Sequence, residues 1–279
     1  MLFRYFGQQA AWERKGFRFK MPIKLLDSTL VSLTISVYDW AHYTTSKGAV
    51  KMHTLLDYDC LLPEFMNITG GKRTDNKAAF DIEIKPHSIV VADRGYCDYG
   101  LLNHWDSNNV FYVVRHKDDI QHRTIKELPL PEKHAQNVLL DEIIEFELPT
   151  AKDKCPKRLR RIAVWDEEHG FVIELLSNNV TLAASTIAKL YKARWNIEIF
   201  FHNLKQLLRI KSFIGISRNA VETQIWTAMI TMLLFSWLKH IARYKWALAN
   251  LAFLALAQHI YQNRPIQVAE RALYTPSPG

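Results

Sequence analysis

Residues 191–206 read YKARWNIEIFFHNLKQ, and the rest of the sequence is organised around them. At about 100° per residue, the period of an α-helix, this stretch separates into two faces. Apolar side chains gather on one arc, the face that a helix buries; they are Ala193, Ile197, Phe200, Phe201, Leu204 and Leu208. A polar stripe runs beside this arc and consists of Tyr191, Arg194, Glu198, His202, Lys205 and Arg209. The stretch therefore predicts a helix on which a lone carboxylate lies between cations.

The charges on this stripe have two interpretations. A solvated face is the simpler one, because opposite charges four residues apart stabilise an exposed helix by roughly a few tenths of a kcal/mol per pair. The stripe, however, borders the apolar arc instead of lying opposite it. Charges in that position are expected at the edge of a cleft, where they can act on a ligand.

The same residues carry a resemblance to a known family. The spacing Tyr-x2-Arg-x3-Glu-x6-Lys resembles the Y-R-E-K signature of bacterial insertion-sequence transposases of the IS-four type, and is met at Tyr191, Arg194, Glu198 and Lys205. The Trp after the Arg, the Phe-Phe pair and the Leu-Lys-Gln that follow extend the match. The resemblance covers roughly residues 23–224. It implies an RNase H-like fold and a metal-binding Asp-Asp-Glu triad whose third member is Glu198.

Composition and charge are typical of a globular protein with a polyanionic partner. Hydrophobic residues make up 48% of the 279 residues, with 10 Gly and 10 Pro, which excludes a disordered chain. Lys and Arg number 36 against 28 Asp and Glu, a net charge of +8 that favours nucleic acid. The three cysteines lack a C-x-x-C spacing, so no disulfide framework or zinc site is predicted and a reducing cytosol fits best. No signal peptide or membrane span is predicted either.

Two strand-like stretches each carry an Asp. Residues 22–36 are rich in β-branched side chains and contain Asp27, which is either a structural Asp at a bend or a rigid anchor for a metal. Residues 88–92, SIVVA, predict a buried inner strand that ends at Asp93. Open α/β sheets bind ligands at such carboxyl ends. The Asp-x-Thr at Asp27 and the Asp-Arg-Gly-Tyr at Asp93 are similar to the motifs around the family's first and second catalytic Asp.

The remaining elements of the predicted core are short. Strands are expected at 49–57, 64–69 and 110–117, and helices at 76–84 and from 99 to 105. His53 lies in the first of these strands. For His53 a hydrogen-bonded position in the strand is the simpler interpretation, and a role as metal ligand or base is the other.

About a hundred residues separate Asp93 from Glu198, far more than a compact sheet needs to reach its next helix. The excess predicts a β-rich insertion at 118–178, with strands at 142–148, 158–165 and 171–176. Family members carry such an insertion between the last core strand and the Glu-bearing helix. The predicted fold class is α/β, and the resemblance implies an RNase H-like mixed sheet flanked by helices. The expected domains are 1–117 and 179–242 for the two parts of the catalytic core, 118–178 for the insertion, and 243–279 for a C-terminal helix and tail.

The insertion contains a run of basic side chains, opposed only by Asp153: Lys152, Lys154, Lys157, Arg158, Arg160 and Arg161. Such a run fits either a solvated edge strand or a ridge that contacts phosphates. Trp165 follows and has two interpretations as well. It is either part of the core of a hairpin or, as in relatives, a residue that stacks on an extruded base.

The resemblance implies a complete active site. Asp27, Asp93 and Glu198 would be the catalytic residues and would hold two Mg²⁺ or Mn²⁺ ions, which prefer oxygen ligands. The DNA contacts would come from Tyr191, Arg194, Lys205, Arg94, Arg209 and Trp165. The signature helix is expected to begin near Thr181 or Ser185, either of which could cap it, and to run to about Ile210.

The predicted protein is a DNA transposase core. It would hydrolyse a strand at the end of the element and use the freed 3′-hydroxyl to attack target DNA, as at least a dimer on DNA in the bacterial cytoplasm, associated with the nucleoid. Two other functions remain open: a catalytically idle fragment that binds DNA or full-length partners, and a generic metal-dependent nuclease. Relatives place a helical DNA-binding segment before the first Asp, and only 26 residues precede Asp27 here. An amino-terminally truncated product is therefore expected.

Overall fold

The structure is a computed structural model, and it describes residues 16–17, 19–34, 38–41, 43–44, 48–117, 120–130, 137–208 and 213–241. The described residues form two compact units, one ending at Ile199 and the other beginning at Phe200. The first unit contains every strand of the described chain, and the second contains the end of α6 and all of α7. None of the described helices is both long and apolar enough to cross a bilayer.

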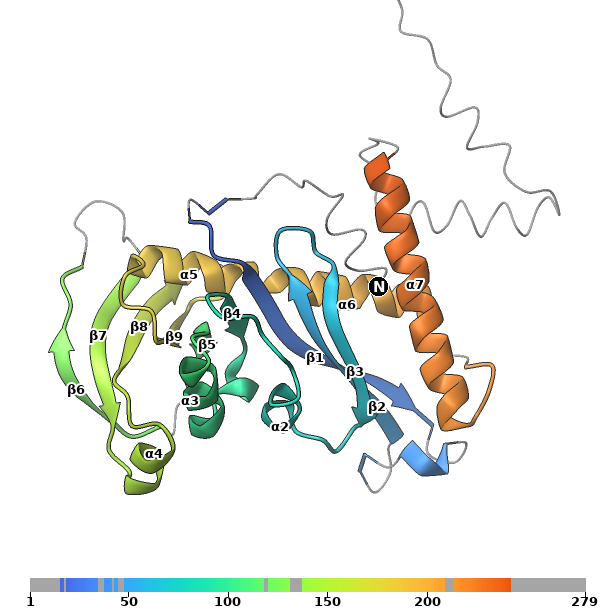
Figure 1. Cartoon of the computed structure of the whole chain (residues 1–279), viewed down its shortest axis with the longest axis horizontal. Helices are drawn as coiled ribbons and strands as arrows, with labels where there is room; N and C mark the ends of the chain where they lie inside the picture. The colour runs from blue at the N-terminus through green and yellow to red at the C-terminus, as the bar shows by residue number, and fades with distance from the viewer. Residues whose placement is uncertain are drawn as a thin grey trace, which may run out of the picture. The chain divides into compact units, whose positions relative to one another are not determined.

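Nine strands form a single mixed sheet in the order β3-β2-β1-β4-β5-β9-β8-β7-β6 (Figure 1). Their bounds are β1 Ile23–Leu33, β2 Gly48–Asp57, β3 Pro63–Gly70, β4 Ile89–Ala92, β5 Phe111–Arg115, β6 His122–Glu127, β7 Val138–Phe146, β8 Leu159–Asp166 and β9 Phe171–Ser177. The pairs β1–β4 and β4–β5 are parallel, and the other neighbours are antiparallel. The predicted mixed sheet with helices is confirmed at this level.

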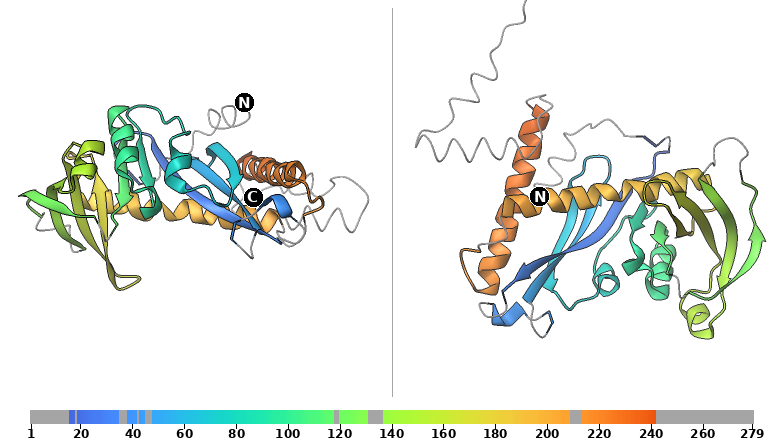
Figure 2. Two further views of the ribbon diagram at one scale, coloured as in Figure 1. Left: turned by 90° about the horizontal axis from the view of Figure 1, so that it is seen from below. Right: turned by 180° about the vertical axis from the view of Figure 1, so that it is seen from behind.

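The helices of the first unit flank this sheet. In the described chain the helices are η1 Asp39–Ala41, α2 Asp75–Ala79, η2 Arg94–Tyr96, α3 Tyr99–Ser107, α4 Pro149–Lys154, α5 Ala184–Ala193, α6 Trp195–Leu208 and α7 Arg218–Ile241. Figure 2 shows α3 and α5 on opposite faces of the sheet, and α5 contacts β4, β5 and β7. A side-chain cap begins α3, where the carboxylate of Asp98 accepts a 3.1 Å hydrogen bond from the backbone N–H of Leu101.

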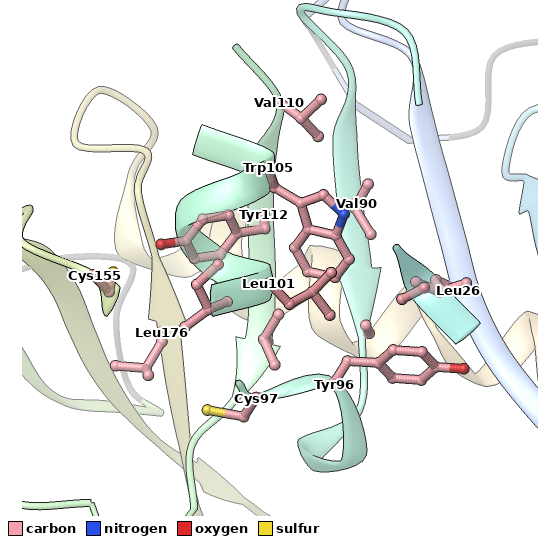
Figure 3. Packing of buried hydrophobic residues seen from close by; sticks show 14 of the residues in the cluster. Leu26, Val90, Tyr96, Cys97, Leu101, Trp105, Val110, Tyr112, Cys155 and Leu176 are labelled. Carbon is pink, nitrogen blue, oxygen red and sulfur yellow. The ribbon is translucent and has the colours of Figure 1, made fainter. Parts of the chain in front are cut away.

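The hydrophobic core on the α3 face is built from alternate strand residues. Leu101 and Trp105 of α3 pack against Val90 of β4 and Tyr112 of β5 (Figure 3). Leu26 of β1 belongs to the same cluster. Successive strand side chains point to opposite faces, so the neighbours of these residues along each strand face the side that α5 covers.

The strands predicted within residues 118–178 are present, and they extend the same sheet. β9 pairs antiparallel with β5, with Leu176 opposite Val114, so the segment β6–β9 continues the sheet begun by β1–β5. Asn178, just after β9, fixes the junction: its side-chain oxygen accepts from the Tyr112 N–H at 3.0 Å and its amide donates to the Val110 carbonyl at 3.0 Å. Strands β9, β8, β7 and β6 therefore extend the sheet from the edge of β5.

The signature helix differs from its prediction. The sequence predicted one helix to about Ile210, but α5 ends at Ala193 and α6 begins at Trp195. Around Arg194 the backbone bonds span three residues, from the Arg194 N–H to the Tyr191 carbonyl and from the Ile197 N–H to the Arg194 carbonyl, both at 3.0 Å. The helix tightens at this point into a 3₁₀-type turn.

A side-chain hydrogen bond marks the end of α5, and the start of α5 has no side-chain cap. The amide of Asn196 donates to the Ala193 carbonyl at 2.7 Å, and such local bonds compete with the helical pattern. At the other end, α5 begins after Ala183, which offers no side-chain cap. The predicted cap by Thr181 or Ser185 was therefore wrong. The backbone N–H of Thr181 instead donates to the side-chain oxygen of Asn179 at 3.0 Å.

Candidate active site

Parallel pairing of β1 with β4 brings two of the predicted carboxylates side by side. Leu26 of β1 lies opposite Ala92, the last residue of β4. The next residues along the two strands are Asp27 and Asp93. Because Leu26 points to the α3 face, alternation turns the side chain of Asp27 to the face that α5 covers.

The hydroxyl of Tyr191, near the end of α5, donates a 3.0 Å hydrogen bond to Asp93 Oδ1. Burial raises the pKa of Tyr191 to about 12, and the negative charge of Asp93 adds to the rise. The phenol therefore stays protonated at neutral pH and remains a donor to the carboxylate. This bond holds Asp93 against the helix that precedes Arg194.

Arg194 joins the other two predicted carboxylates. Its Nη1 lies 3.2 Å from Asp27 Oδ2, and its Nη2 lies 2.7 Å from Glu198 Oε1. The Arg194 side chain is 13% exposed and the Glu198 side chain 35%. The guanidinium thus bridges a carboxylate of the sheet and a carboxylate of α6, and the 3₁₀-type turn lies at the bridging residue itself.

The electrostatics of Asp27 reflect this crowding. Burial raises the pKa of Asp27 to about 6, an effect that the Arg194 charge and the Ser28 backbone N–H partly oppose. The Ser28 N–H donates to Asp27 Oδ1 at 2.8 Å. The charges of Asp93 and Glu198 raise the pKa further, as like charges in close proximity do. The three acids therefore form one electrostatically coupled cluster around a single guanidinium.

A second polar network supports β1 beside this cluster, and its centre is Asp75, a residue that no sequence pattern singles out. Asp75 Oδ1 accepts from the Ser28 hydroxyl at 2.6 Å and from Lys51 Nζ at 3.2 Å. His53 Nδ1 lies 3.6 Å from the same oxygen. Asp75 is the first residue of α2 and lies far from Asp27 in the sequence. Only the fold reveals that Asp75 binds Ser28, the residue next to Asp27.

His53 has the structural role that was the simpler interpretation. Its Nε2 lies 3.0 Å from the Thr69 hydroxyl of β3. Burial lowers the pKa of His53 to about 4, and the nearby Lys51 charge acts in the same direction, against the opposing effect of Asp75. The imidazole is therefore neutral at pH 7 and is held within the sheet.

The predicted DNA contacts lie in different places. Arg94 begins η2, directly after Asp93. Trp165 is 40% exposed at the end of β8, opposite Val172 of β9, so it is not a buried core residue. Lys205 belongs to α6 in the second unit, and burial lowers its pKa. Arg209 lies outside the described residues.

Two of the basic residues at 152–161 are structural, because acids from neighbouring strands pair with them. Arg160 is buried, and its Nε and Nη2 donate to the two oxygens of Asp141 at 2.7 and 2.6 Å. Arg161 donates to Glu142 and Glu174, each at 2.6 Å. Neither residue is part of an exposed ridge for phosphates, whereas Arg158 beside them is exposed.

The carboxylates offer oxygen ligands, which suit Mg²⁺ and Mn²⁺. Within the described residues, no three Asp, Glu, His or Cys side chains are grouped closely enough as they stand to hold a metal ion. The guanidinium of Arg194 lies between Asp27 and Glu198 instead. These carboxylates therefore already bind a positive charge, and their oxygen atoms are suitable ligands for a metal cation.

Residues 18–234 match the model of the family described as "Transposase DDE domain". The chain belongs to this family. Members of the DDE family act on DNA and generally use divalent metal ions. In this DDE-family protein the charges of Asp93 and Glu198 both act on Asp27.

Several known proteins are similar to this DDE-family chain. The probable transposase for insertion sequence element IS5377 of Geobacillus stearothermophilus is 27% identical over 90% of this chain and 65% of its own length. The putative transposase y4zB of Sinorhizobium fredii is 29% identical over 89% of this chain and 69% of its own length. The chain thus spans about two thirds of the length of these relatives. A piggyBac transposase, solved in a synaptic complex with hairpin DNA, aligns with a TM-score of 0.48 and 12% identity over 92% of this chain and 58% of that chain.

Proposed function

We propose that this chain is the catalytic core of an insertion-sequence transposase of the Y-R-E-K subgroup. It cleaves a DNA strand at the end of the element and joins the freed 3′-hydroxyl to target DNA. One observation carries the proposal: Asp27, Asp93 and Glu198, distant in sequence, form one coupled cluster with Arg194 and Tyr191. Carboxylates from separate elements are what a phosphoryl-transfer site needs to hold metal ions.

The sheet supports an RNase H-like core. Its first five strands have the order β3-β2-β1-β4-β5; β1, β4 and β5 run parallel, and β2 is antiparallel to both of its neighbours, β1 and β3. In such a core, Asp27 is on the central strand and Asp93 follows its neighbour. Residues 118–178 would be the insertion, and 1–117 with 179–242 the two parts of the core.

Asp27, Asp93 and Glu198 are the residues that would hold two Mg²⁺ or Mn²⁺ ions. Ions bound there supply charge neutralisation on the transferring phosphate and activation of an oxygen nucleophile. Tyr191 orients the Asp93 carboxylate through its hydroxyl. The Ser28 N–H orients that of Asp27. These two bonds fix the directions in which the carboxylate oxygens point before any ligand arrives.

The cations of the signature would bind the DNA backbone. Arg194 contacts two of the carboxylates, and its planar guanidinium can bind two phosphate oxygens at once. Lys205, Arg94 and Arg209 would add further phosphate contacts. The exposed ring of Trp165 is available to stack on a base. Two ends of the element must be brought together, so the active assembly would be at least a dimer on DNA.

The test is Mn²⁺-dependent nicking of supercoiled plasmid DNA by the purified protein. We expect nicking by the wild type and none by Asp93→Asn. Asp81→Asn is the control, because Asp81 is an exposed carboxylate paired with Arg73, and it should nick as the wild type does. Equal nicking by Asp93→Asn would overturn the triad. A wild type that binds DNA without nicking it would favour the idle fragment, and nicking without strand joining would favour a nuclease.

A further inference from the structure

Arg194 contacts one oxygen on each of two carboxylates that are proposed to hold a metal ion. Asp27 Oδ2 and Glu198 Oε1 each accept from a different Nη atom of the one guanidinium. A divalent ion bound by both residues has to approach each of these carboxylates to about 2 to 2.5 Å. A planar guanidinium and such an ion cannot fill the same space between two carboxylates.

From this we infer that Arg194 is a stand-in cation, which occupies the metal position in the metal-free protein and has to leave it before an ion can bind. The inference rests on the proposed function, since it concerns the same three carboxylates. It adds a role for Arg194 that binding a DNA phosphate does not require. The same side chain would hold the site together when it is empty and contact the substrate when it is loaded.

The electrostatics explain why these carboxylates need a cation between them. The negative charges of Asp93 and Glu198 both act on Asp27, which is itself largely buried. Like charges in a partly desolvated site repel strongly. The guanidinium offsets this repulsion with two hydrogen bonds to carboxylates, and charge-assisted bonds of this kind are the strong ones.

Arg194 also has the means to move. Its backbone lies at the 3₁₀-type turn between α5 and α6 rather than inside a regular helix. Its guanidinium carbon lies 5.6 Å from the ring centroid of Tyr191, a cation–π contact that can persist when the carboxylates are released. Leaving the carboxylates would free its donors for a phosphate, so binding of metal and binding of DNA would support each other.

The experiment measures Mn²⁺ affinity without DNA, from the electron paramagnetic resonance signal of the free ion. We expect Arg194→Gln to bind Mn²⁺ about tenfold more tightly than the wild type, because a charged hydrogen bond is worth on the order of a tenfold change in an equilibrium constant. Without metal, the same variant should melt at a lower temperature. Unchanged or weaker Mn²⁺ binding by Arg194→Gln would overturn the inference.

Arg218→Gln is the matched control. Arg218 Nε lies 2.7 Å from Glu222 Oε1, in an exposed pair with the same four-residue spacing as Arg194 and Glu198. Its loss should leave the Mn²⁺ affinity unchanged. Arg194→Lys keeps the charge but has a single nitrogen with which to bridge two carboxylates, so its affinity should lie between those of the wild type and Arg194→Gln.

Two further measurements separate this inference from the proposed function. If Asp93→Asn binds Mn²⁺ as the wild type does, the proposed metal site itself fails. If Asp93→Asn loses Mn²⁺ binding while Arg194→Gln binds Mn²⁺ as the wild type does, only the stand-in role fails.

Should the Arg194 variants not fold, the wild type alone can test the inference. Mg²⁺ should shift the side-chain Nε–H resonance of Arg194 in ¹⁵N spectra. An unchanged resonance under saturating Mg²⁺ would refute the exchange of Arg194 for the ion.

Discussion

The Tyr191 hydroxyl lies 3.0 Å from Asp93 Oδ1 and joins residues 98 positions apart. Through this bond, α5 fixes a carboxylate that follows β4. Asp27, on the neighbouring strand, is held by Arg194 at the end of the same helix. Two consecutive turns of one helical segment therefore position both Asp residues of the cluster.

Tyr191→Phe removes that bond and keeps the ring. We expect the nicking rate to fall by about tenfold, because a hydrogen bond to a charged group is worth on the order of 1.5–3 kcal/mol and its loss lets the Asp93 carboxylate rotate. Rates measured on supercoiled plasmid with Mn²⁺ check this, beside a melting curve that shows the fold is kept. An unimpaired rate would mean that Asp93 is oriented by other groups.

Ser28→Ala removes the 2.6 Å bond from the Ser28 hydroxyl to Asp75. We expect a loss of about 1–2 kcal/mol in the free energy of unfolding, near the lower end for bonds to charged groups, because Asp75 is partly exposed and water can replace the donor. Urea denaturation at pH 7 measures the loss. A variant as stable as the wild type would show that the Asp75 network contributes nothing to the sheet.

His53 makes the free energy of unfolding depend on pH, with stability lost as the pH falls. Burial holds its pKa near 4 in the folded protein, below the value of 6.5 for a free imidazole, so the unfolded chain binds the proton more readily. The contribution of the neutral His53 to the free energy of unfolding is fully present above pH 6.5 and is lost as the pH falls toward 4. Between pH 7 and 4.5 the wild type should lose about 2–3 kcal/mol more than His53→Gln, which cannot take up a proton. Parallel pH profiles from chemical denaturation would contradict this.

Arg160 and Arg158 are expected to differ in their contribution to stability, because Arg160 is in a buried ion pair and Arg158 is exposed. Arg160→Ala leaves the buried Asp141 carboxylate without its partner, and breaking a buried pair from one side costs about 3–5 kcal/mol. Arg158 is exposed, so Arg158→Ala should change stability by less than about 0.5 kcal/mol. Chemical denaturation of both variants tests the difference. Similar losses in the two variants would mean that the Arg160 pair is not a buried one in solution.

Local patterns in the sequence predicted much of the sheet. The run SIVVA became β4, with Asp93 directly after it, and the alternating segments of the insertion became β7, β8 and β9. The prediction failed where side chains from other positions intervened. The amide of Asn196 contributes to the break in the expected single helix at Arg194, and acids on β7 and β9 bind the arginines that had seemed unopposed.

The sequence by itself determined the motifs around the three acids, since a motif depends only on neighbours along the chain, and the family resemblance turned those motifs into a prediction of the site. It pointed to Asp27, Asp93 and Glu198 before any contact between them was known. Only the tertiary structure decided that parallel pairing of β1 with β4 brings the two Asp residues together. It also decided that Arg194 lies between Asp27 and Glu198. Such contacts depend on strand register and on the packing of α5 on the sheet, which join residues that no local pattern relates.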